Sequence, residues 1–253
     1  MDRRELYENK VLKYLDKDFP QKSKNPNFYI SCESELIIGY EFLMNGYDLK
    51  KKKTEGPDFL IQDKNRNIWV EVVAPEEGQH PRLKNKERLS SGEMAEVDSD
   101  NCKLQMASAI CSKKDKFKLY VQKGIVSQED IKIICVNLFN LGSGKNSCPY
   151  IASVLYGLEE VRWVDVKTMQ SGTEYLPHKP AVKKTGAKID FGLFLQTEYE
   201  KIDGVIWFDY SLRLIVPEEY KIEFFANANR KEKIGDLFPK WRRVYYENGF
   251  LTS

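Results

Sequence analysis

The chain has 253 residues, 42% of them hydrophobic, which is enough to bury one sizeable core. Its 40 basic and 38 acidic residues nearly cancel, so the overall charge gives no strong argument for a nucleic-acid or membrane partner, and any basic surface must be local. No apolar run reaches membrane-spanning length, and five cysteines without a C-x-x-C pair fit neither a zinc ribbon nor a disulfide framework. We therefore expect a single cytoplasmic domain, residues 1–253, with no membrane partner.

Two helices are predicted at the start of the chain. Residues 2–16 place apolar side chains at helical spacing among charged ones, which is typical of a short amphipathic helix. After a proline-containing loop, Ser31 or Ser34 can cap a second helix, and Asn45-Gly46 supplies its stop signal. Glu35 then lies in the first turn of that helix.

The next elements predict a sheet with crossover helices. Three extended segments, 47–53, 58–63 and 68–74, are separated by Gly56-Pro57 and a polar turn, which indicates a small meander. Residues 75–101 contain few large apolar side chains and are predicted to form a long loop. Beyond it the pattern predicts a helix at 102–123, a buried strand at 131–138 and a helix at 150–158.

The last third of the chain adds further strands. Residues 172–190 are predicted as a basic loop, and a final helix carries Trp241, Tyr245 and Tyr246. Late strands are expected at 204–208, 212–216 and 222–225. The predicted fold class is α/β, a mixed central β-sheet flanked by helices, with a core at about 31–140 and a C-terminal elaboration at about 141–253 that contributes the β additions.

Asp58 and Glu71 are the first candidate site residues. If the connecting loop holds four residues, Asp63 faces Ile68, Asp58 faces Val73, and the two acids lie on one side of the sheet. A three-residue loop would place them on opposite faces. Converging carboxylates suit Mg²⁺ or Mn²⁺, and Glu35 from the neighbouring helix could complete the site.

Each acid also has a simpler interpretation. An aspartate after Gly-Pro is usually a turn residue, and a lone helix glutamate is usually a cap or solvated. Glu71 interrupts an apolar run, so it either faces solvent or is buried with a partner or a metal.

The segments Gly56-Pro-Asp-Phe-Leu-Ile61 and Ile68-Trp-Val-Glu-Val-Val-Ala-Pro75, set between two helices, resemble the PD-(D/E)XK, or restriction-endonuclease-like, nuclease superfamily. The resemblance covers roughly 33–138. It implies a restriction-endonuclease-like core in which Asp58, Glu71 and the main-chain carbonyl of Val72 bind Mg²⁺ or Mn²⁺, and in which Glu35 assists through metal-bound water.

The chain departs from this family at one position, where Val73 replaces the lysine that positions or activates water. Some family members supply that lysine from the following helix. Here Lys113 falls within an apolar stripe of that helix, formed by Met106, Ile110, Phe117 and Tyr120. Lys113 either extends to the protein edge or reaches the acids as the displaced lysine, and Lys103 is a weaker candidate.

The resemblance thus predicts a Mg²⁺-dependent nuclease that cleaves phosphodiester bonds of nucleic acid, DNA in the first instance, as a monomer or homodimer. The alternative is a catalytically degenerate nuclease fold that binds nucleic acid or a protein partner. An unrelated hydrolase or transferase ranks last, because the glycine-rich 142–147 segment lacks a phosphate-loop pattern and the two histidines, His80 and His178, have no supporting spacing. The basic runs at 50–53 and 183–188 either line a backbone-binding cleft or are solvated.

Overall fold

The computed structural model describes residues 3–25, 28–50, 55–75, 99–141, 148–177, 181–182, 188–212, 222–247 and 250–252. Its α-helices are α1 (Arg3–Val11), α2 (Phe19–Lys22), α3 (Tyr29–Met44), α5 (Ser99–Gln122), α6 (Cys148–Tyr156) and α7 (Lys231–Ile234). Short 3-10 helices are η1 (Leu12–Tyr14), η4 (Phe139–Leu141), η6 (Leu193–Leu195), η7 (Thr197–Tyr199) and η8 (Ala228–Arg230).

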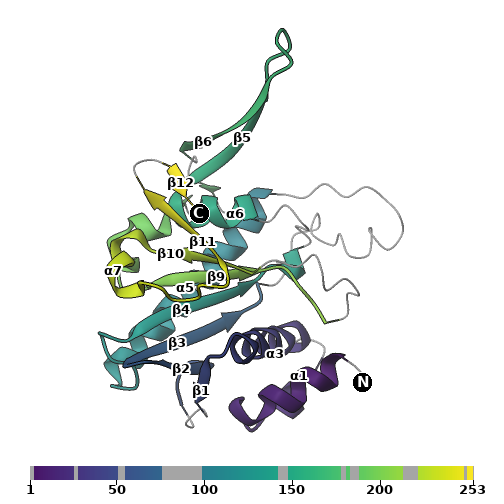
Figure 1. Ribbon diagram of the computed structural model, residues 1–253, viewed down its shortest axis with the longest axis vertical. Helices are drawn as coiled ribbons and strands as arrows, with labels where there is room; N and C mark the ends of the chain where they lie inside the picture. The colour runs from purple at the N-terminus through teal and green to yellow at the C-terminus, as the bar shows by residue number, and fades with distance from the viewer. Residues whose placement is uncertain are drawn as a thin grey trace.

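One mixed sheet organises the molecule (Figure 1). In spatial order its strands are β1 (Asp48–Lys50), β2 (Phe59–Asp63), β3 (Arg66–Val73), β4 (Ile131–Asn137), β9 (Gly204–Phe208), β10 (Ile222–Ala226), β11 (Arg242–Glu247) and β12 (Phe250–Thr252). The first three are antiparallel neighbours, β3, β4 and β9 run parallel, β10 reverses, β11 runs parallel to β10, and β12 reverses again. The α/β class with a mixed sheet and flanking helices is therefore confirmed.

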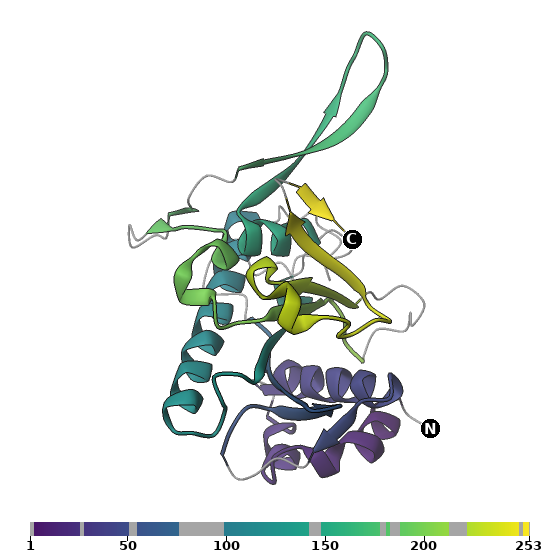
Figure 2. The same cartoon turned by 60° about the vertical axis from the view of Figure 1, so that its left-hand side comes forward.

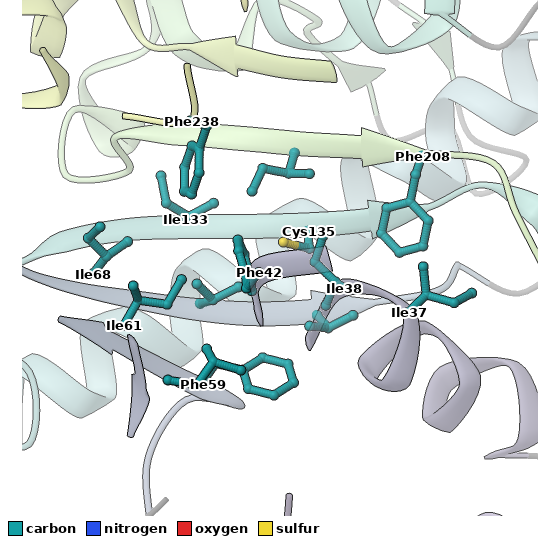
Figure 3. Packing of buried hydrophobic residues seen from close by; sticks show 14 of the residues in the cluster. Ile37, Ile38, Phe42, Phe59, Ile61, Ile68, Ile133, Cys135, Phe208 and Phe238 are labelled. Carbon is teal, nitrogen blue, oxygen red and sulfur yellow. The ribbon is translucent and has the colours of Figure 1, made fainter. Parts of the chain in front are cut away.

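Two apolar layers cover the two faces of the sheet. The α3-side core joins α1 and α3 to alternate residues of the strands, and Figure 3 shows Ile37 of α3 near Phe208 and Ile38 near Cys135 of the sheet. The α5-side core packs α5 and α6 on the opposite face. Because strand side chains alternate between faces, β3 directs Ile68, Val70 and Val72 toward α3 and the residues between them toward α5.

Helix α3 begins earlier than expected, at Tyr29, so Glu35 lies in the second turn and not the first. Ser34 is inside the helix, where its hydroxyl donates to the carbonyl of Ile30 at 2.6 Å. The predicted end is confirmed, with Asn45 as the cap and Gly46 in the left-handed region at φ 84°.

The connection between β2 and β3 is shorter than expected. Asp63 pairs with Arg66 and not with Ile68, so Lys64-Asn65 forms a two-residue turn with Lys64 at a positive φ of 55°. The observed strand pairing differs from the expected one by two residues. Because this number is even, each side chain lies on the face of the sheet that the four-residue loop would have given it. Asp58 immediately precedes Phe59, which pairs with Val70, so Asp58 lies opposite Glu71 on the neighbouring strand.

The predictions for the last third of the chain were partly wrong. The basic loop 172–190 contains β6 (Ser171–Pro177), β7 (Ala181–Val182) and β8 (Lys188–Ile189), and β6 pairs with the unpredicted β5 (Leu158–Val164) in a hairpin that projects from the body (Figures 1 and 2). The predicted final helix is β11, because its Arg-Arg-Val-Tyr-Tyr-Glu sequence favours a strand paired beside β10.

Several predicted features lie outside the described residues. These are most of the loop 75–101 and of the strand 212–216, both histidines, the glycine-rich segment 142–147 and most of the two basic runs. Within the described chain, Cys32, Cys102, Cys111 and Cys135 form no disulfide. None of the described helices combines the length and apolar character needed to cross a bilayer.

Candidate functional site

Glu71 is a buried carboxylate in the middle of the sheet. It lies on β3 between Val70 and Val72, pairs across to Ile134 on β4, and keeps only 1% of its surface exposed. Strand alternation turns its side chain toward α5, away from the apolar α3-side core. A buried carboxylate requires hydrogen-bond donors or a cation, so the solvent-facing interpretation of Glu71 is excluded.

Asp58 lies beside it at the open end of β2. Its Oδ2 accepts a hydrogen bond of 2.7 Å from the main-chain N–H of Val72, and its side chain is 17% exposed. Since β2 begins only at Phe59, the next N–H group along β3 has no strand partner and is available to the carboxylate. Asp58 is therefore fixed to the strand that carries Glu71.

Lys113 of α5 lies on both acids. Its Nζ donates to Glu71 Oε2 at 2.5 Å, lies 3.8 Å from Asp58 Oδ2, and belongs to a side chain that is 12% exposed. The structure thus brings together three of the four predicted catalytic residues. Lys103, the weaker candidate, lies elsewhere, with its Nζ 3.7 Å from carboxylate oxygens of Asp100 and Glu159.

Two further α5 residues contact Glu71 and were not predicted as site residues. The Tyr120 hydroxyl donates to Glu71 Oε1 at 3.1 Å, and Lys116 Nζ is 3.7 Å from Oε2. Spacings of three and seven residues from Lys113 put both on the same helix face. Tyr120 had been assigned to the apolar stripe, and that spacing from Lys113 is the signal that would have identified it.

The charges of the cluster act on one another. Burial, followed by the negative charge of Asp58, raises the pKa of Glu71, while Lys113 and Lys116 oppose that rise. For Lys113 burial acts to lower the pKa, but Asp58 and Glu71 together raise it above its ordinary value, so the ammonium stays charged. Two carboxylates therefore share a small volume with lysines as their counter-charges.

Glu35 is not part of this cluster. The pKa of Lys22 is raised by its hydrogen bond with Asp18 and, to a smaller extent, by the charge of Glu35, and the pKa of Cys32 is raised by burial and then by Glu35, which places Glu35 near these two groups. A different α3 glutamate is buried, Glu33, whose Oε2 accepts from the Ser211 hydroxyl at 2.6 Å. The expectation that Glu35 completes the acidic set is therefore not supported by its position.

The donor set fits a hard divalent cation. Carboxylate oxygens of Asp58 and Glu71 both face the Lys113 ammonium. The two acids therefore attract a positive charge to one point, as they would a metal cation. The carbonyl of Val72 belongs to the residue whose N–H holds Asp58. Among the described residues no group of three or more histidine, cysteine, aspartate or glutamate side chains is placed to hold a metal, and the carboxylates of this cluster are Asp58 and Glu71.

Comparison of the chain with protein-family models, with curated proteins and with solved structures finds no match. The interpretation of the site therefore depends on its own geometry and on the sequence resemblance.

Proposed function

We propose that the protein is a metal-dependent phosphodiesterase, a nuclease of the PD-(D/E)XK type, with Asp58 and Glu71 as metal ligands. One observation carries the proposal: Lys113, from the helix after the glutamate strand, lies 2.5 Å from Glu71 and 3.8 Å from Asp58. A lysine from that helix takes the place of the one that the family has two residues after the glutamate. The order of α3, the β1–β3 meander, α5 and β4 along the chain supports it too, since it is the order that the sequence resemblance implies.

Each side chain has a distinct role in this proposal. A divalent cation bound here would supply a Lewis acid and lower the pKa of a bound water. Asp58, oriented by the Val72 N–H, and Glu71, enclosed by the sheet and α5, would hold that cation. Lys113 stays protonated and can orient a water or neutralise charge on a phosphoryl oxygen.

Cleavage assays test this proposal directly. The protein is incubated with DNA and with RNA in Mg²⁺, Mn²⁺ or EDTA, beside Asp58→Asn, Glu71→Gln and Lys113→Met variants. We expect cleavage only with metal, and a loss of roughly a hundredfold or more in each variant, because each removes a charge from the reacting centre.

Lys118→Met is the matched control, since Lys118 is an exposed lysine of α5 and no contact joins it to the acids among the described residues. Its cleavage rate should equal that of the unmodified protein. Activity that persists in EDTA, or that survives both acid substitutions, would contradict the proposal.

A second candidate is a nucleic-acid-binding protein that has lost hydrolysis. Val73 favours it, because this side chain packs against the apolar α5-side core at the position where the family has its lysine. Metal-dependent binding of an oligonucleotide without any cleavage would support this candidate over the first.

A further inference from the structure

The two oxygens of the Glu71 carboxylate have different partners. Oε1 accepts a hydrogen bond of 3.1 Å from the Tyr120 hydroxyl, whereas Oε2 is the atom contacted by Lys113 at 2.5 Å and by Lys116 at 3.7 Å. Asp58 lies on the Oε2 side, since its own Oδ2 is 3.8 Å from the same Lys113 ammonium. One oxygen thus faces the charged centre and the other faces a neutral donor.

The tyrosine is itself held in place. Its ring meets that of Phe117, a fully buried residue one turn earlier, edge to face at 6.3 Å and 84°. The tyrosine hydroxyl therefore has a fixed position beside Oε1.

We propose that Tyr120 is a positioning residue of the site: it holds Oε1 of Glu71 and so keeps Oε2 directed at Lys113, Asp58 and a bound cation. A carboxylate with one oxygen tied to a rigid donor cannot rotate freely about its terminal torsion, which is otherwise a soft one. The hydroxyl acts through Glu71 and not on the substrate. The positioning role rests on the proposed function, which supplies the bound metal. Tyr120 is a site residue that the sequence resemblance does not include.

The test is Tyr120→Phe, which keeps the ring and its contact with Phe117 and removes only the hydroxyl. Tyr47→Phe is the matched control, because the Tyr47 hydroxyl also makes one hydrogen bond, accepting from the N–H of Phe238 at 2.9 Å, at a place remote in the fold from Glu71. Mn²⁺ binding is followed by titration calorimetry in both variants. We expect a dissociation constant raised roughly three- to tenfold in Tyr120→Phe, in proportion to one hydrogen bond, and no change in Tyr47→Phe.

Two further measurements separate positioning from general stability. In the cleavage assay, kcat should fall in Tyr120→Phe while KM for the oligonucleotide stays constant, since no substrate contact is removed. In a double-mutant cycle with Glu71→Ala, the effect of Tyr120→Phe on the midpoint of urea unfolding should vanish once the carboxylate is gone.

The outcomes distinguish the two proposals. Wild-type cleavage with an unchanged Mn²⁺ affinity in Tyr120→Phe would overturn the positioning role and leave the nuclease proposal standing. Mn²⁺ binding that weakens in Tyr120→Phe, in a protein that cleaves neither DNA nor RNA, would support the positioning role and remove the nuclease. Absence of Mn²⁺ binding to the wild-type protein would overturn both.

Discussion

Glu71 and Asp203 are both buried carboxylates next to cationic side chains, yet their surroundings differ. Asp203, with none of its side chain exposed, precedes β9. It accepts hydrogen bonds from the Lys132 main-chain N–H at 2.8 Å, from Arg230 Nε at 2.9 Å and from Lys233 Nζ at 3.4 Å. Glu71 has no such main-chain donor among its described contacts and has Asp58, a second negative charge, beside it.

The difference separates a structural carboxylate from one suited to binding. The described contacts of Asp203 are hydrogen-bond donors and cations, whereas Glu71, whose two oxygens also have donors, lies beside the negative charge of Asp58. Burial and that charge raise the pKa of Glu71. A bound cation would offset the repulsion between the Glu71 and Asp58 carboxylates. Asp203 has no comparable repulsion to offset among its described contacts. Stability should therefore depend on Asp203, and metal affinity on Glu71.

The largest effect is expected from Asp203→Ala. It leaves Lys132 N–H, Arg230 and Lys233 without their shared acceptor, and we expect a loss of about 3–5 kcal/mol in the free energy of unfolding. Urea denaturation measures it, with Asp236→Ala as the control, because Asp236 is an exposed acid that contacts Lys64 and Arg66 at the surface. Equal midpoints for the two variants would show that the Asp203 network is not structural.

Mn²⁺ should stabilise the protein through Glu71. At a concentration a hundred times the dissociation constant, a cation that binds only the folded state adds about 2.7 kcal/mol. Differential scanning fluorimetry should show a rise in melting temperature that is absent in Glu71→Gln and retained in Asp203→Ala. An equal rise in Glu71→Gln would place the cation elsewhere.

A smaller, pH-dependent effect is expected from Lys132. This lysine is buried on β4, donates to the carbonyls of Gln128 and Asp130, and burial and the charge of Lys233 lower its pKa to about 8. Between pH 8 and its ordinary pKa the unfolded chain binds more protons at Lys132, so its contribution to folding stability rises with pH in that window. Asp203 and Asp130 oppose the lowering, and Arg230 adds to it.

The Lys132→Met variant isolates this pH-dependent contribution of Lys132 to folding stability. Urea unfolding at pH 7.5 and at pH 10 should show the wild-type protein gaining about 1–3 kcal/mol relative to the variant. Parallel pH profiles would mean that Lys132 has an ordinary pKa in the folded state.

The acid pair and its lysine were predictable because their signals are local. Strand alternation places Asp58 and Glu71 on one face if the connecting loop has an even number of residues and on opposite faces if the number is odd, and the sequence left both alternatives open. The two-residue turn has the even parity of the four-residue alternative, so the two acids share a face. A charge within an apolar helical stripe singled out Lys113 in the same way.

Other features depend on contacts between distant segments. Tyr120 in an apolar stripe is typical of a core residue, and its hydroxyl has a partner 49 positions away in the sequence. Asp203 acquires its role only when β4 and the turn around η8 meet it. The aromatic-rich segment at 242–247 was misread as a helix because pairing with β10, not its own periodicity, decides its conformation.

The two-residue turn at Lys64-Asn65 has a genetic consequence. Both faces of the sheet are covered by apolar layers, which fixes the faces to which the side chains of β2 and β3 are directed. An extra codon in the turn would therefore lengthen the loop and leave Asp58 and Glu71 on one face, whereas an extra codon within β3 before Glu71 would force a bulge or turn Glu71 away from Lys113. Length variation should be tolerated in the turn and not in the strands that carry the two acids.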